Sequence, residues 1–229
     1  MFLFNWKFGI GLFGIGSIRI EVYYICYTKF MPHLSGVFDE FPDLDKVSIE
    51  EIGSRIKPKP DVHALANFLG NRILYPQTVC LTVEEMELDL AILSLGVKLR
   101  PGLFYEPQSN KLLIPQRFVE RFPNLELLIK AILEGVNPKG THVIYIKNNS
   151  QLHLVGSVVS PIDPTKLSTD GKNVIFKGLA IEKVLPIGMI SVIKTPQKAA
   201  KILLNEQEFD IFGGDAGIFI DLRMGEFAK

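Results

Sequence analysis

The stretch of this chain that most resembles a functional site is Gly213-Gly214-Asp215-Ala216-Gly217. A glycine-rich turn lets a ligand or another backbone approach closely, and its successive amides can form an anion-binding nest. Gly213, Gly214 and Gly217 are therefore candidate ligand-binding residues. The alternative is a plain hairpin loop, in which glycines adopt positive φ and Asp215 forms the turn. No Gly-Lys-Ser or Gly-Lys-Thr follows, so the stretch is not a P-loop.

Three aspartates lie close together in this part of the sequence. If Asp210 and Asp221 stand on neighbouring strands, they can form a carboxylate pair with Asp215 between them in the loop. Paired carboxylates carry out general acid–base chemistry or hold Mg²⁺. Asp210, Asp215 and Asp221 are therefore the candidate catalytic residues. The alternative is that they are the solvent-facing partners of alternating apolar residues.

Other reactive side chains show no spacing that points to a site. Cys26 and Cys80 lie far apart and outside any Cys-x-x-Cys pattern, so we expect buried thiols in a reducing, cytoplasmic compartment. The four histidines form no metal-binding pattern, and we expect neither a metal nor a cofactor. His142 and His153 are expected to face each other across a hairpin centred on Asn149.

Composition argues against a surface built to grip nucleic acid. The 229 residues include 25 Lys plus Arg and 25 Asp plus Glu, which gives a formal net charge of zero. Proteins that bind nucleic acid through phosphates usually carry a basic surplus. With 47% hydrophobic and 22% charged residues, the chain is an ordinary globular sequence that can bury a core.

The first 30 residues form an apolar N-terminal segment with three alternative interpretations. The run from Phe8 to Ile18 is too short for a membrane span, which needs about 20 residues. The segment packs on the body as a strand near Ile18–Tyr27, or it contacts a partner or a membrane surface peripherally. In the third interpretation translation begins at Met31, and the segment is not part of the fold.

Capping signals predict helices across residues 31–138. Ser48, Asp61, Thr82 and Asn124 each precede a run with helical periodicity, and Ser48 and Thr82 are followed three residues later by Glu. We expect these helices to end at the Gly or Pro that follows each run, namely near Ile56 and at Gly70, Gly96 and Gly135. A strand edge is expected over Ile73–Leu81 and a hairpin over residues 103–114. This part is predicted to be a mixed α/β lobe.

Short β-like runs split by Gly, Asp and Pro follow over residues 139–229. A hairpin over Thr141–Ser160 leads into further strands, so we predict a mostly antiparallel β lobe, a small barrel or sandwich. Gly178 is expected to mark a bulge, and Ala199–Leu204 fits a helix or a strand. The chain is therefore predicted to be α+β. In strand order alone, the second lobe resembles a small PUA-like pseudo-barrel, and that resemblance carries over no site residue.

The leading functional hypothesis is a non-catalytic binding or assembly component that acts through contact with a protein partner or with itself. An apolar N-terminal segment supports it, because exposed apolar stretches mark interfaces. One alternative is an RNA-binding module, in which the lysines of residues 139–204 converge on one face. Another is an enzyme with a carboxylate site near the Gly213–Gly217 loop.

Overall fold

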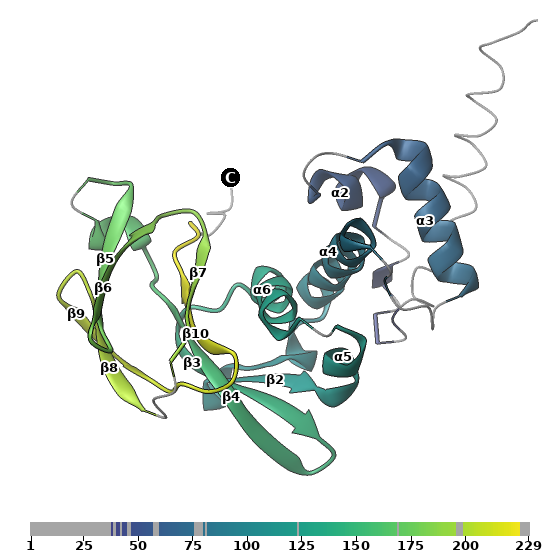
Figure 1. Cartoon of the computed structure of the whole chain (residues 1–229). Helices are drawn as coiled ribbons and strands as arrows, with labels where there is room; N and C mark the ends of the chain where they lie inside the picture. Colours follow the sequence, from purple (N-terminus) through teal and green to yellow (C-terminus); the bar gives the residue numbers. More distant parts are fainter. Residues whose placement is uncertain are drawn as a thin grey trace, which may run out of the picture.

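The computed structural model describes residues 38, 40–41, 43–44, 47–56, 60–75, 80, 82–122, 124–168, 170–195 and 199–224. Within these residues the chain forms five α-helices, mostly N-terminal, and ten strands, mostly C-terminal, in two sheets (Figure 1). The predicted α+β class is therefore confirmed. The apolar segment 1–30 lies outside the described residues.

Each predicted capping residue stands at the start of a helix. Ser48 Oγ accepts a hydrogen bond from Glu51 N, and Asp61, Thr82 and Asn124 accept equivalent bonds from the first turns that follow them. These side chains satisfy amides that have no partner inside a helix. The helices are α2 (Ile49–Ser54), α3 (Val62–Leu74), α4 (Val83–Leu99), α5 (Gln116–Arg121) and α6 (Leu125–Val136).

The predicted helix ends at glycine were wrong, because all three glycines lie inside helices. Helix α3 continues past Gly70 to Leu74, so Ile73 and Leu74 are helical and not part of a strand edge. A Cβ on Gly96 would lie 2.5 Å from the Phe41 ring, and one on Gly135 would lie 2.6 Å from Ser94 O. At those two positions glycine allows close packing.

The larger sheet has six strands in the order β1-β2-β3-β4-β10-β7. It contains strands from both sides of residue 138, since β2 pairs in parallel with β3. Strand β10 also pairs in parallel with β4, while the other neighbours are antiparallel. The strands are β1 (Tyr105–Glu106), β2 (Lys111–Pro115), β3 (Gly140–Asn148), β4 (Gln151–Ser160), β7 (Ile190–Ile193) and β10 (Gly217–Asp221).

The smaller sheet is antiparallel, in the order β6-β5-β8-β9. Gly178 ends a strand at a two-residue turn over Leu179–Ala180, so the predicted bulge was wrong. The segment Ala200–Leu204 is a strand, which settles the open choice between helix and strand. The four strands are β5 (Asn173–Gly178), β6 (Ile181–Pro186), β8 (Ala200–Leu204) and β9 (Gln207–Ile211).

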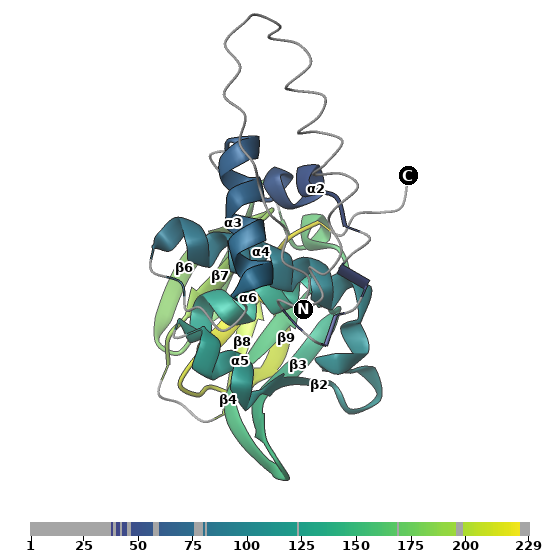
Figure 2. The same cartoon turned by 90° about the vertical axis from the view of Figure 1, so that its right-hand side faces the viewer.

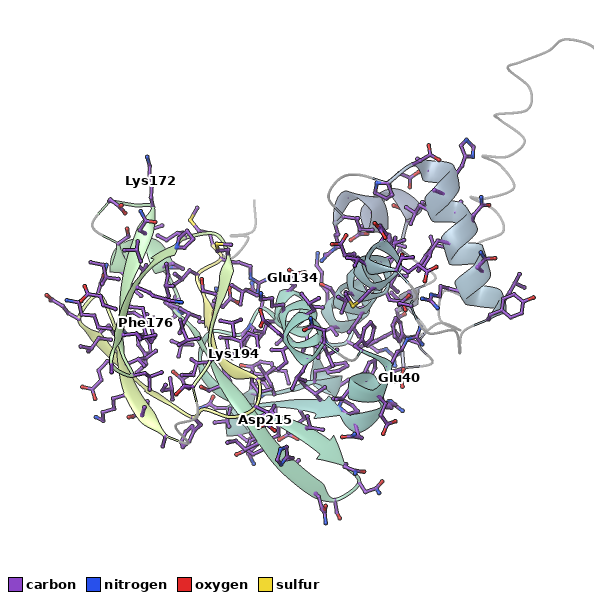
Figure 3. All side chains as sticks on the ribbon, viewed as in Figure 1. Glu40, Glu134, Lys172, Phe176, Lys194 and Asp215 are labelled. Carbon is purple, nitrogen blue, oxygen red and sulfur yellow. The ribbon has the colours of Figure 1, made fainter. Side chains whose placement is uncertain are left out.

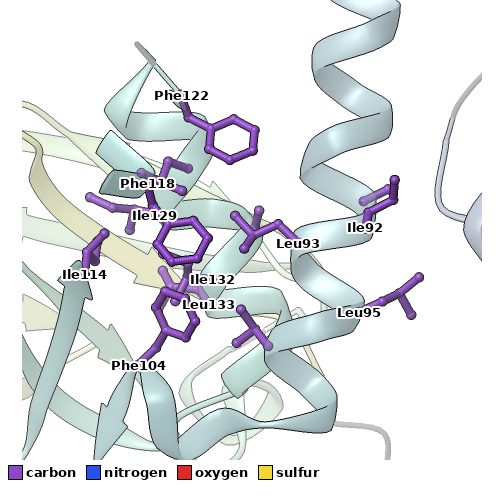
Figure 4. Packing of buried hydrophobic residues seen from close by; sticks show 14 of the residues in the cluster. Ile92, Leu93, Leu95, Phe104, Ile114, Phe118, Phe122, Ile129, Ile132 and Leu133 are labelled. Carbon is purple, nitrogen blue, oxygen red and sulfur yellow. The ribbon is translucent and has the colours of Figure 1, made fainter. Parts of the chain in front are cut away.

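Two hydrophobic cores lie on opposite faces of the six-stranded sheet. One contains residues of α4, α5 and α6 together with Ile144, Val158 and Phe219 of the sheet. Figure 4 shows part of it, with Leu93 of α4, Phe118 of α5 and Ile132 of α6. The other joins Val159, Ile218 and other sheet residues to the four-stranded sheet. The two sheets pack face to face as open sheets, and in the part of the chain described they do not close into a barrel. The layers are helices, large sheet and small sheet.

The β3–β4 hairpin extends beyond the other strands of its sheet, as two perpendicular views show (Figures 1 and 2). Its tip is a turn at Asn149–Ser150, with Asn149 at φ +51°. The surfaces around this hairpin contain the pockets described next.

Candidate functional site

The Gly213–Gly217 loop connects β9 to β10 and lies against two neighbouring strands. A Cβ on Gly214 would be 2.5 Å from Val155 C, and one on Gly217, at φ +89°, would be 2.6 Å from Ile193 O. Ala216 N also donates a hydrogen bond to Val155 O, at 2.8 Å. Backbone packing therefore explains Gly214 and Gly217 without a ligand.

A pocket of about 780 Å³ opens beside this loop. It includes two of the predicted ligand-binding glycines, Gly213 and Gly214, and the predicted catalytic Asp215. Figure 3 labels Asp215 and Lys194 of this lining. The lining comes from β4, the end of β7 and the loop, and consists of His153, Leu154, Lys194, Thr195, Gly213, Gly214 and Asp215. Segments more than 60 residues apart in sequence, such as His153 and Asp215, thus share one concave surface.

Close polar contacts position the charged side chains of this pocket. His153 Nε2 lies 3.4 Å from Asp215 Oδ2, and both side chains are exposed. Lys194 Nζ donates to Ala216 O at 3.1 Å and lies 3.3 Å from Glu126 Oε2 on α6. The hydrogen bond from Lys130 and the contact with Lys194 hold the pKa of Glu126 below its ordinary value. Glu126 thus contacts both Lys130 and Lys194, whereas Asp215, among the described residues, contacts the imidazole of His153.

The three predicted catalytic aspartates contact different side chains. Asp210 on β9 is exposed and lies 4.0 Å from Lys201 Nζ. Asp221, at the end of β10, is buried and accepts three hydrogen bonds from Arg223, two from the guanidinium at 2.9 and 2.6 Å and one from the backbone N at 3.1 Å. Arg223 Nη2 also donates to Leu133 O, which connects β10 to the end of α6. Of the three, only Asp215 lines the pocket.

Two more pockets continue this surface around the β3–β4 hairpin. One, of about 530 Å³, shares His153 with the first pocket and is also lined by Gln116 of α5, Ile146 and Leu152. Another, of about 480 Å³, shares Gln116 and Asn148 with the second. It is lined by Gly102, Leu103, Tyr105, Glu106, Leu113, Pro115, Gln116, Arg117, Lys147, Asn148 and Asn149. We call the three together the hairpin surface.

The hairpin residues form no recognisable site motif in the sequence, and the expectation that His142 and His153 face each other was wrong. His142 pairs with Val158 and His153 with Ile146, so the rings do not face each other. His142 is buried, its Nε2 lies 2.9 Å from Lys139 O, and its ring packs edge-on against Tyr105. Burial lowers the pKa of His142. His153 is the histidine that reaches the pocket.

Helix α4 contains a second polar cluster that the sequence analysis missed. Asp89 lies in an acidic stretch of the helix, yet it is fully buried and lies within ion-pair distance of Arg72 and Arg121. Cys80 Sγ donates to Asp89 Oδ2 at 3.2 Å. Burial, followed by the Asp89 charge, raises the pKa of Cys80 to about 12. This cluster connects α3, α4 and α5 and is a structural feature.

Several lysines of the second lobe pair with acidic residues. Lys166 lies near Asp163, Lys177 near Glu182, and Lys201 near both Glu208 and Asp210. In the part of the chain that the structure describes, no group of three or more His, Cys, Asp or Glu gathers as metal ligands would. No helix within those residues is long and apolar enough to cross a membrane.

Comparison of the chain with protein-family models, with curated proteins and with solved structures finds no match. The hairpin surface is therefore the feature from which a function can be inferred.

Proposed function

We propose that this protein is a non-catalytic binding component that recognises a protein partner through the hairpin surface. The observation that carries the proposal is the continuity of three open pockets around the β3–β4 hairpin. An extended surface that spans several shallow pockets suits a polypeptide better than a small molecule, which prefers one enclosed cavity.

The chemistry of the lining fits a polypeptide partner. The pockets are lined both by apolar residues, such as Leu103, Leu113 and Leu152, and by amides, such as Asn148 and Gln151. Side-chain amides can donate to and accept from a peptide backbone. Charges of both signs are present: Glu106, Arg117 and Lys147 line one pocket, and Asp215 lines another. Mixed charge provides specificity for a partner with complementary charges.

The distribution of lysines supports a protein partner over RNA. An RNA-binding face needs unopposed cations to contact phosphates. Lys177, Lys194 and Lys201 each lie within ion-pair distance of a carboxylate, so their charges are largely compensated. The different contacts of Asp210, Asp215 and Asp221 favour binding over acid–base catalysis. We propose that the protein binds its partner in the cytoplasm.

The test is site-specific photocrosslinking in the full chain. A benzophenone amino acid replaces Leu152, which is 45% exposed on the hairpin, and the matched control replaces Val184, which is 66% exposed on β6. We expect a protein crosslinked from position 152 and not from position 184. The purified partner should then bind the wild-type chain and the Val184→Glu variant alike, and the Leu152→Glu variant more weakly. A crosslink to RNA, or none to any macromolecule, would contradict the proposal.

A further inference from the structure

Strand β4 is longer than the strand that pairs with it on one side. It spans Gln151–Ser160, but β10 pairs only with Gly156–Val159. The last backbone hydrogen bond on that side is from Ala216 N to Val155 O. Among the described residues, no strand therefore pairs with the segment 151–154 on the side away from β3. We call this segment the β4 edge.

The register determines which backbone groups of the β4 edge point outward. Asn148 and Gln151 close the hairpin across a two-residue turn, so they form a hydrogen-bonded pair. Hydrogen-bonded and non-bonded pairs alternate along an antiparallel ladder. His153 thus bonds to β3, whereas the N–H and C=O of Leu152 and Leu154 point away from it. These outward groups are available to another strand.

The surroundings of the β4 edge suit an extended polypeptide. Leu152 offers an apolar contact, and His153 and Leu154 line the pocket beside the Gly213–Gly217 loop. Asp215 lies at that pocket with 80% of its side chain exposed. Lys194 Nζ contacts Glu126 and Ala216 O, and among the described residues the ring of His153 is the group within ion-pair distance of Asp215. The exposed carboxylate of Asp215 can therefore contact a cation of a ligand as well.

We propose that the β4 edge binds an extended segment of the partner polypeptide as an added strand, with a Lys or Arg of that segment contacting Asp215. Main-chain bonds to Leu152 and Leu154 supply affinity, and alternate side chains supply specificity, as in other cases of strand addition. This inference rests on the proposed function, because it specifies how the partner engages the hairpin surface.

Edge strand β6 provides a contrast. Lys183 stands opposite Phe176, whose side chain faces the core, so β6 carries a charge at an inward-facing edge position. An inward-pointing charge at an edge discourages strand addition. The described β4 edge carries no Lys, Arg, Asp, Glu or Pro.

The test uses the full chain and a phage-displayed library of short linear peptides as the probe. We expect selected peptides to contain Lys or Arg among alternating apolar residues. Asp215→Lys should weaken their binding at least about tenfold, whereas Asp210→Lys, an equally exposed control on β9, should leave it unchanged. Leu154→Pro removes an outward N–H without removing a β3 bond and should abolish binding, while Leu154→Val should retain it.

Amide hydrogen exchange by NMR gives the readout that side-chain contacts alone would not produce. Bound peptide should slow exchange of the Leu152 and Leu154 amides and leave the Gln151 and His153 amides, already bonded to β3, unchanged. Slowed exchange at all four amides or at none, or failure to select any peptide, would overturn the inference. If position 152 still crosslinks to a protein in that case, the proposed function stands and only strand addition fails.

Discussion

Arg72 on α3 and Asp89 on α4 form an ion pair inside the protein. Arg72 Nε lies 3.1 Å from Asp89 Oδ1, and the two side chains are 3% and 0% exposed. Arg121 on α5 approaches the other carboxylate oxygen at 3.3 Å. One buried carboxylate thus balances cations from two helices, and the packing of α3, α4 and α5 depends on it.

Asp89→Asn should lower the free energy of unfolding by about 3–5 kcal/mol, because it removes the charge that faces the buried guanidinium of Arg72. Urea denaturation measures the change. The control is Glu87→Gln, an exposed position on the same helix, which should alter stability by less than about 0.5 kcal/mol. Equal effects of the two substitutions would show that the buried ion pair contributes no more to the free energy of unfolding than an exposed carboxylate does.

Cys80 should react slowly with thiol reagents in the folded protein. Its pKa is raised from 9.0 to about 12, mainly by burial and then by Asp89, so the thiolate population falls about a thousandfold. In a Cys26→Ser variant, Cys80 is the remaining cysteine. Its reaction with a chromogenic disulfide reagent is followed by absorbance at mildly alkaline pH. We expect fast reaction only after denaturation. An equally fast reaction in the native state would refute the prediction.

His142 should make the protein less stable at acidic pH. Burial lowers its pKa in the folded state, so the unfolded chain binds the proton more readily. Stability from this residue is present above the unfolded pKa of about 6.5 and is lost as pH falls below it, by at most about 1.4 kcal/mol per pH unit.

Denaturation curves for wild type, His142→Gln and the exposed control His153→Gln, recorded from neutral pH to about pH 5, measure this dependence. The dependence of the unfolding free energy on pH should become weaker in His142→Gln and stay unchanged in His153→Gln. If His153→Gln flattens it equally, the buried ring is not its source.

Gly214→Ala should destabilise the protein by about 1–3 kcal/mol, because the added Cβ would overlap the backbone of Val155. Gly102→Ala is the control, since a Cβ there meets nothing within 4 Å. Thermal denaturation of both variants checks the difference. If Gly214→Ala is as stable as Gly102→Ala, close packing against β4 does not require glycine at position 214.

Local features of the chain were predictable from the sequence. Ser48, Asp61, Thr82 and Asn124 begin their helices as expected, because a capping bond involves residues only two or three positions apart. The change from helical to β-like periodicity near residue 138 likewise predicted the α+β class, since each pattern reflects the period of one element. Gly213, Gly214 and Asp215 line one pocket, and their roles as site residues stay predictions.

Long-range packing decided the rest. Gly96 and Gly135 look like helix stops in sequence, yet each lies where a distant group comes too close for any side chain. Asp89 looks like one of several acidic residues at a helix start, yet it alone is buried between arginines. His153 meets Asp215 because β10 pairs in parallel with β4 and this pairing begins at Gly156, five residues after β4 begins at Gln151. The periodicity of apolar residues in the sequence indicates whether an element is a helix or a strand. The strand register and the neighbours of each side chain are determined only when the elements pack together.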